Sequence, residues 1–317
     1  MTMSNTPGDP PAPSHGHSHT HATATMSRKR LAWALGVTAS ILFVEIVGAI
    51  WSGSLALLAD AGHMTTDSIG LVVALFAAHL MTRPRTDKWT WGFARLEILA
   101  AGLQAGLLIV LCGFIGWEAV GRFMNPTAVE AGPMLLVGVI GLVANVISMS
   151  ILFGGRGASL NMKAAFLEVS ADALGSVAVI VAALVLMWTG WPYADSLASL
   201  LIAIMIAARA VAILRQSVDI LLEKTPSGLD LNEVRKRICE NPAVRQVHDL
   251  HVSSIGTGLN ILTAHVIVSE ECVSSGQTVE VLHDLQEALK SGFDVDLNHV
   301  TLQIDSDLHA SHEDLAH

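Results

Sequence analysis

Six stretches of mostly apolar residues limit what this chain can fold into. Each has roughly the 20 residues that a helix needs to cross the hydrocarbon core of a bilayer. The chain is 52% hydrophobic and only 15% charged, with a mean hydropathy of +0.53, which is rare in a soluble protein of 317 residues. We therefore predict a polytopic α-helical membrane protein with spans at 31–51, 54–80, 96–120, 133–153, 164–188 and 196–214.

The basic residues indicate how these spans are oriented, because Lys and Arg favour cytoplasmic loops. They precede the first span, separate the second from the third and the fourth from the fifth, and mark the end of the sixth. They are Arg28, Lys29, Arg30, Arg83, Arg85, Lys88, Arg95, Arg156, Lys163, Arg209, Arg215 and Lys224. The opposite loops hold Arg122 alone. Both termini are therefore predicted to be cytoplasmic, which also supports an even number of spans.

A change in composition after Thr225 predicts a separate soluble domain. From residue 226 onward there are 15 Asp or Glu and 5 Lys or Arg, so the net charge of −10 belongs to this region. Such acidity argues against nucleic acid as a partner and is compatible with cations. The apolar patterns predict helices at 229–238 and 277–289 and strands at 247–253, 260–268 and 300–304. This order is that of a small α+β domain of the ferredoxin-like, metallochaperone-like type.

The two ends of the chain look like tails. Residues 1–30 are rich in Pro, Ser, Thr and Ala, which predicts disorder, and they contain alternating histidines, at 15, 17, 19 and 21, that can bind zinc-like ions loosely. A solvated tail with biased composition explains them equally well. The predicted organisation is a cytoplasmic tail (1–30), a six-helix domain (31–215), a regulatory and dimerisation domain (226–307) and a flexible tail (308–317).

Ionisable residues interrupt two of the apolar spans at the same spacing. His63 and Asp67 stand four residues apart in the second span, as do Glu168 and Asp172 in the fifth. Residues at i and i+4 project from one side of a helix, and ionisable groups at membrane depth are usually functional. The two pairs offer one nitrogen and three carboxylates, enough for a four-coordinate divalent metal. A polar contact between helices or a His–Asp hydrogen bond is the alternative for either pair. Glu45, in the first span, is interpreted as a helix contact or the lining of a water cavity.

Several motifs together resemble those of the cation diffusion facilitator family, near its bacterial cobalt–zinc–cadmium resistance branch. They are SGSLALLADAGHM at 52–64, GFARLEILAA at 92–101, DALGSV at 172–177, VHDLHV at 247–252 and HVTLQI at 299–304. The similarity extends over about 28–307. It implies a six-helix transporter that exports Zn²⁺, often with Cd²⁺ or Co²⁺, in exchange for protons. It also implies a homodimer whose cytoplasmic domains pair.

The resemblance also implies roles for individual residues. The transport site of the family falls on His63, Asp67, Glu168 and Asp172. Many zinc-transporting members have His in place of Glu168, so the oxygen-rich site here argues against strict zinc selectivity. Arg95 and Glu223 correspond to a salt bridge near the membrane face. The loop after the second span has aromatic residues where some relatives bind metal, and we expect no metal there.

The resemblance also implies a regulatory metal site in the soluble domain, across the dimer interface. Its candidate ligands are His248, His265, His283 and Asp305. Of these, His283 stands on a predicted helix and is explained equally well as a solvated surface residue. For His251 and His299, which also lie in the matching motifs, a surface role is the preferred interpretation.

Two other classes of function are weighed against transport. A membrane metalloenzyme needs more histidines than His63 and His79 in or beside the helices, and no motif for covalent chemistry is present. A membrane metal sensor does not need acidic pairs in two separate helices. The sequence therefore favours a transporter that is not an enzyme. The resemblance and the short loops imply that it is located in a bacterial inner membrane. Metal and protons would compete in it for the same ligand atoms.

Overall fold

The computed structural model describes residues 39–153 and 160–306. Both predicted tails, the start of the first predicted span and residues 154–159 lie outside these residues. The helical part consists of Ala39–Ser52, α2 (Leu55–Met81), α3 (Leu96–Met124), α4 (Ala131–Phe153), α5 (Leu160–Thr189) and α6 (Ala194–Leu221).

The helices confirm the predicted class of membrane protein. In the part of the chain that the structure describes, α3, α4, α5 and α6 are long and apolar enough to span a bilayer. Helix α2 has 27 residues, or about 40 Å at 1.5 Å per residue, but its ionisable and hydroxyl side chains lower its hydropathy. The described part of the first helix is apolar and shorter. Gly53, with φ +67°, turns the chain from this helix into α2.

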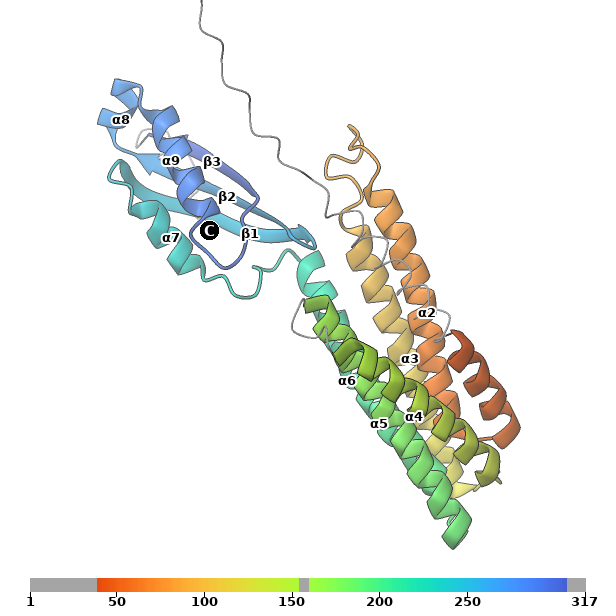
Figure 1. Ribbon diagram of the computed structural model, residues 1–317. Helices are drawn as coiled ribbons and strands as arrows, with labels where there is room; N and C mark the ends of the chain where they lie inside the picture. The colour runs from red at the N-terminus through yellow and green to blue at the C-terminus, as the bar shows by residue number, and fades with distance from the viewer. Residues whose placement is uncertain (1–38, 154–159, 307–317) are drawn as a thin grey trace, which may run out of the picture.

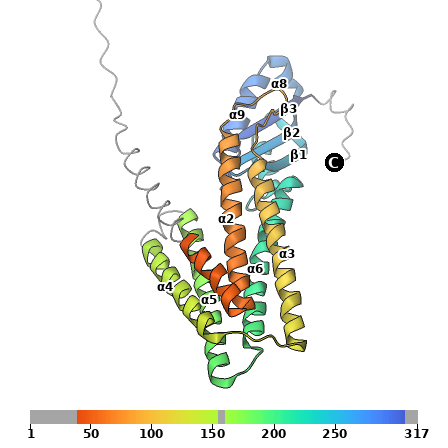
Figure 2. The ribbon, with the colours of Figure 1, turned by 90° about the vertical axis from the view of Figure 1, so that its right-hand side faces the viewer.

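Two pairs of helices make the most extensive contacts, α3 with α6 and α4 with α5. Helix α2 packs on α3 and α6, beside which it lies in Figure 2, and it touches α5 over a shorter stretch. Small residues allow the close approaches. A Cβ atom at Gly62 would lie 2.9 Å from Leu111 of α3, and one at Gly138 would lie 3.0 Å from Val179 of α5. Close helix packing through glycine is typical of membrane bundles.

The soluble domain follows α6 and has the predicted α+β fold. It comprises α7 (Leu231–Cys239), β1 (Val244–Gly256), β2 (Leu259–Val268), α8 (Glu270–Ser275), α9 (Thr278–Lys290) and β3 (His299–Asp305). The strand order is β1-β2-β3, with β1 antiparallel and β3 parallel to β2. Side chains of α7 and α9, such as Ile238 and Leu285, pack with Leu262 and Val266 in one core. Helix α8 is not among the predicted elements; it is six residues long, with Ser269 as its N-cap and Gly276 at its C-terminal end.

The soluble domain lies beyond the end of α6 (Figure 1), and it contacts the loop between α2 and α3. Arg95 Nη2 lies 2.7 Å from Glu223 Oε1, just after α6. The ring of Trp91 meets that of His299 edge-on, with centroids 5.1 Å apart. At Gly256 the backbones come so close that a Cβ atom would lie 2.8 Å from the carbonyl oxygen of Ala94. These contacts place the soluble domain at the end of the bundle where α2 and α6 finish.

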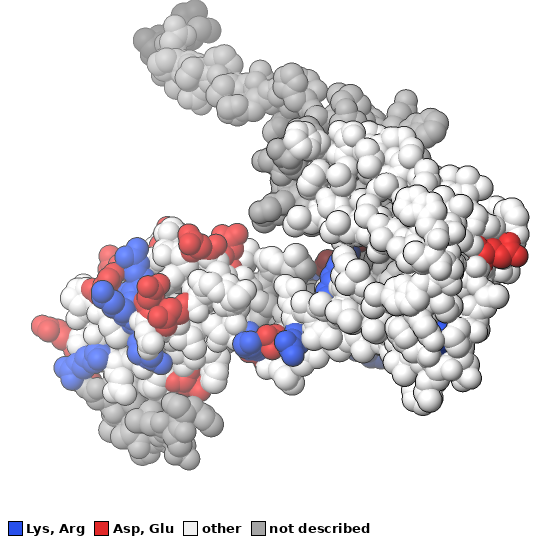
Figure 3. Space-filling model, turned by 90° about the horizontal axis from the view of Figure 1, so that it is seen from below, with Lys and Arg blue, Asp and Glu red and all other residues white. Residues whose placement is uncertain are grey.

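Charged residues are unevenly distributed over the surface. In Figure 3 the soluble domain carries closely spaced Lys, Arg, Asp and Glu side chains, whereas most of the helical part facing the viewer is uncharged. Large apolar side chains such as Trp117 and Ile50 are exposed along the helices. An uncharged belt of exposed apolar side chains is what a bilayer requires of a spanning domain.

Candidate metal sites

His63 is the centre of the polar group inside the bundle. It is buried on α2, and its Nε2 lies 3.4 Å from Asp67 Oδ2 on the same helix and 3.7 Å from Asp172 Oδ1 on α5. The i, i+4 spacing accounts for the first contact, and the packing of α2 on α5 produces the second. Among the described residues, His63 Nδ1 is buried without a hydrogen-bond partner. The structure thus brings together three of the four residues predicted from the two spans.

A cavity of about 140 Å³ lies beside His63, between α2, α5 and α6. Its polar lining consists of Asp60, His63, Asp172 and Arg209, and small or apolar residues of α5 and α6 complete the wall. Asp60 is buried three residues before His63, hence on nearly the same side of α2. Asp60 stands in the same apolar run as His63, and this position marks it as a candidate in the sequence. It is not part of an i, i+4 pair, so that pattern alone does not detect it. The cavity is large enough for a hydrated metal ion.

The remaining predicted ligand, Glu168, has a different partner. Its Oε1 lies 2.8 Å from Nη2 of Arg209 on α6. The sequence analysis placed Arg209 among the charges that mark the end of the sixth span, but its side chain lines the cavity. Arg209 stands inside the predicted span 196–214, and an ionisable residue within a membrane span is usually functional, so the sequence contained a signal for this position. Asp67 also has a partner, because Gln104 Nε2 of α3 donates a hydrogen bond to its Oδ1 at 3.0 Å.

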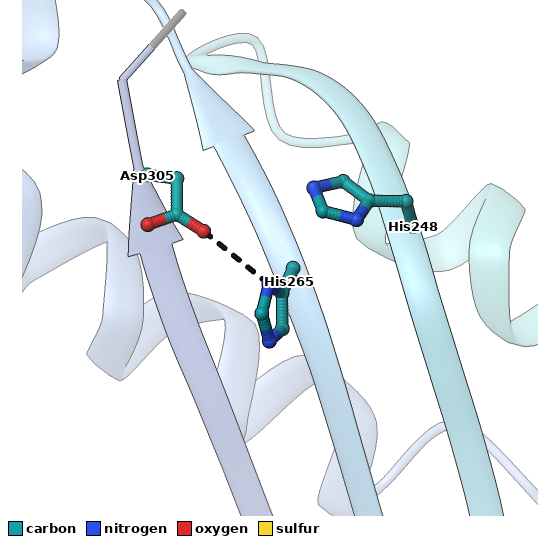
Figure 4. A group of neighbouring side chains, drawn as sticks. All are labelled: His248, His265 and Asp305. Atoms are coloured by element: carbon teal, nitrogen blue, oxygen red, sulfur yellow. Dashed lines mark ion pairs between the residues drawn. The ribbon is translucent and has the colours of Figure 1, made fainter. Parts of the chain in front are cut away.

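A second group of candidate ligands lies on the sheet of the soluble domain. His248 of β1, His265 of β2 and Asp305 of β3 each offer one ligand atom, and these atoms lie within 4.8 Å of one another. Figure 4 shows that the three side chains approach one another from neighbouring strands. His265 Nδ1 lies 3.6 Å from Asp305 Oδ2, and Gln303 Nε2 donates to both oxygens of the buried Asp305 carboxylate at 3.2 Å. Two imidazoles and a carboxylate are a typical donor set for zinc.

The fourth predicted residue of this group, His283, lies apart from the other three. It is exposed on α9, whose neighbouring residues Val281 and Leu285 face the core. An additional residue, Asp249, was missed. It has φ +50° at a register shift of β1, and its carboxylate lies 2.8 Å from His251 Nε2 and 3.8 Å from His265 Nε2. Its position between two histidines in the motif VHDLH was the available signal.

The fold is that of a polytopic membrane protein whose helical bundle and α+β domain each contain a group of candidate metal ligands. Residues 31–222 match the family described as "Cation efflux transmembrane domain", and residues 226–307 match "Cation efflux protein, cytoplasmic domain". The chain therefore belongs to the cation efflux family, the cation diffusion facilitators, and the resemblance drawn from its motifs is confirmed.

Three curated relatives show how far the similarity extends. The chain is 41% identical over 279 residues to "Metal cation efflux system protein CzcD" of Cupriavidus metallidurans, covering 88% of this chain and 87% of that protein. It is 41% identical over 296 residues to "Zinc transporter ZitB" of Escherichia coli, covering 93% and 92%. It is 35% identical over 285 residues to "Cadmium, cobalt and zinc/H(+)-K(+) antiporter" of Bacillus subtilis, covering 89% and 90%.

Proposed function

We propose that the protein is a secondary transporter that exports divalent transition-metal cations from the cytoplasm and takes up protons in exchange. Zinc is the proposed principal substrate, with cadmium and cobalt as further substrates. The observation that carries this proposal is the position of His63 Nε2, between carboxylates of α2 and α5 inside the bundle. The names of the relatives, which include a zinc transporter and a proton-linked antiporter, support the ions and the coupling.

The proposed transport site consists of His63, Asp67, Glu168 and Asp172. To bind a dication, His63 must be neutral and the carboxylates ionised, so metal and protons compete for the same atoms. Metal that enters from the cytoplasm displaces protons, the helices reorient, and protons from the other side displace the metal. An inward proton gradient then makes the cycle export metal. The chemistry involves no covalent step, which agrees with a transporter and not an enzyme.

The soluble domain is the proposed regulatory and dimerisation part. We place it in the cytoplasm, with both termini, because the basic loops lie at its end of the bundle. A regulatory zinc ion bound by His248, His265 and Asp305 would join the three strands of the sheet. The match to a cytoplasmic domain of the efflux family supports a homodimer formed by residues 226–307. The proposed location is the inner membrane of a bacterium.

Flux of ⁶⁵Zn into proteoliposomes tests this function. Vesicles that contain the protein should accumulate zinc when their lumen is acidic, and the accumulation should stop when an ionophore collapses the pH gradient. The direction of the gradient should set the direction of net flux. Equal flux with and without the gradient would rule out proton antiport, and flux no greater than that of empty vesicles would rule out transport.

A further inference from the structure

The ion pair between Glu168 and Arg209 borders the cavity of the proposed transport site. Glu168 is on α5 and Arg209 on α6, and 2.8 Å separates Oε1 from Nη2. Arg209 also lines the cavity that contains His63 and Asp172. A guanidinium within a membrane helix is costly unless a carboxylate or water accompanies it, so this pairing needs an explanation in terms of the site.

The pair occupies a defined level of the bundle. Helix α2 runs toward the end that carries the soluble domain, and α5 runs away from that end. Asp67 and Glu168 therefore lie about 6 Å, one helical turn, closer to the soluble domain than His63 and Asp172. Because the soluble domain is proposed to be cytoplasmic, Arg209 stands on the side from which the metal arrives.

The charges around the cavity favour a divalent substrate. The three carboxylates of the proposed site and Asp60, which also lines the cavity, outnumber the single guanidinium of Arg209, so the region is negative when the carboxylates are ionised and His63 is neutral. A divalent ion offsets two of these negative charges. A monovalent cation brings half of that charge and is a weaker competitor for a carboxylate that already holds a guanidinium.

We propose that Arg209 is an internal cation that holds Glu168 while the transport site is empty and competes with the metal for this carboxylate. This inference rests on the proposed function, in which Glu168 is a ligand. Metal binding separates Glu168 from Arg209, and the return of Arg209 to Glu168 favours release of the metal. Arg209 thus lowers the affinity of the site and speeds turnover, and it is a specificity-determining residue that does not itself bind the ion.

Zinc binding by the full chain in nanodiscs tests the competition. All variants carry His265→Ala, so that the soluble-domain site makes the same contribution to the measured zinc binding in each of them. Arg209→Gln should tighten zinc binding by about tenfold, the scale of one charge-assisted contact. Arg209→Lys keeps the positive charge and should stay near the parent value. Arg215→Gln is the matched control, because Arg215 is a further arginine of the same helix that does not line the cavity.

A second pair of variants separates competition from a structural role. In a Glu168→Gln background the carboxylate is absent, and Arg209→Gln should then leave the dissociation constant unchanged. An Arg209→Gln variant that binds zinc with parent or weaker affinity would overturn the proposal. An equal change in zinc affinity with and without the Glu168 carboxylate would also overturn the proposal, because Arg209 would then act on a group other than Glu168.

Transport kinetics give an independent readout. Arg209→Gln should lower both KM and the maximal rate of zinc flux, because tighter binding slows release. A fall in the maximal rate without a fall in KM would contradict competition. Failure of the proposed function would give a different result. If zinc binding survives Asp172→Ala, the proposed transport site is wrong. If Asp172→Ala weakens zinc binding but Arg209→Gln has no effect on it, only the proposed role of Arg209 is wrong.

Discussion

The carboxylate of Asp195, at the start of α6, caps the N-terminus of α2. Its Oδ2 accepts the backbone N–H of Leu55 at 2.8 Å, and its Oδ1 accepts the N–H of Ala56 at 3.2 Å and the hydroxyl of Ser54 at 2.5 Å. Asp195 is 1% exposed, and Nη1 of Arg122 on α3 lies 3.6 Å from it. One buried carboxylate therefore joins three helices at the end of the bundle opposite the soluble domain.

Replacement of Asp195 by Ala should destabilise the protein strongly. The change leaves three hydrogen-bond donors at the start of α2 without their acceptor, and each buried donor left unsatisfied costs about 1–3 kcal/mol. Arg122 keeps Glu118 as an ion-pair partner. Thermal unfolding in detergent should show a large drop in the midpoint. Asp219→Asn is the control, because its ion pair with Lys224 is exposed and contributes less than about 1 kcal/mol. Equal midpoints for the two variants would contradict a capping role.

Features that depend on one helix or strand were predictable from the sequence. The length of the apolar stretches predicted α3 to α6, because bilayer thickness sets helix length. The His63–Asp67 contact followed from i, i+4 spacing, which is a property of a single helix. The alternation of apolar residues predicted the strands of the soluble domain, including the position of His265 on β2.

Features that depend on how helices face one another were not predictable. Spacing placed Glu168 on the same side of α5 as Asp172, but it did not reveal that Arg209 of α6 lies within reach. The backbone of Asp249 is another case, since a left-handed residue at a strand irregularity has no reliable signal in residue type. For both Glu168 and Asp249, tertiary packing determines which side chain becomes the partner, and the sequence alone does not.

Asp172→Ala should abolish proton-coupled zinc uptake into inverted vesicles while expression remains intact. The variant removes the only carboxylate of α5 that lies near His63 among the described residues. Ser170→Ala is a suitable control, because the Ser170 hydroxyl donates to the Phe166 carbonyl of its own helix. Uptake by Asp172→Ala at the rate of the parent protein would remove Asp172 from the mechanism.

Glu168→His should shift ion preference toward zinc and away from cadmium and cobalt. An imidazole nitrogen replaces one of three carboxylates, and imidazole suits zinc better than a further hard oxygen does. The measurement is the ratio of zinc flux to cadmium or cobalt flux in the same vesicles. Glu168→Gln, which removes the charge without adding a nitrogen donor, should lower all three fluxes alike. An unchanged ratio in Glu168→His would show that this position does not set selectivity.

His265→Ala and His283→Ala should differ in their effect on the soluble-domain metal. His265 Nδ1 lies 3.6 Å from Asp305 and its ring centroid lies 5.1 Å from that of His248, so its removal eliminates the central donor. His283 is exposed on α9 and lies outside this group. In an Asp172→Ala background, where the transport site is disabled, zinc content per chain should fall by one ion in His265→Ala and stay constant in His283→Ala. Equal losses in the two variants would mean that His283 binds the same ion. Because His283 lies outside this group within one protomer, the contact would then come from a second copy of the chain.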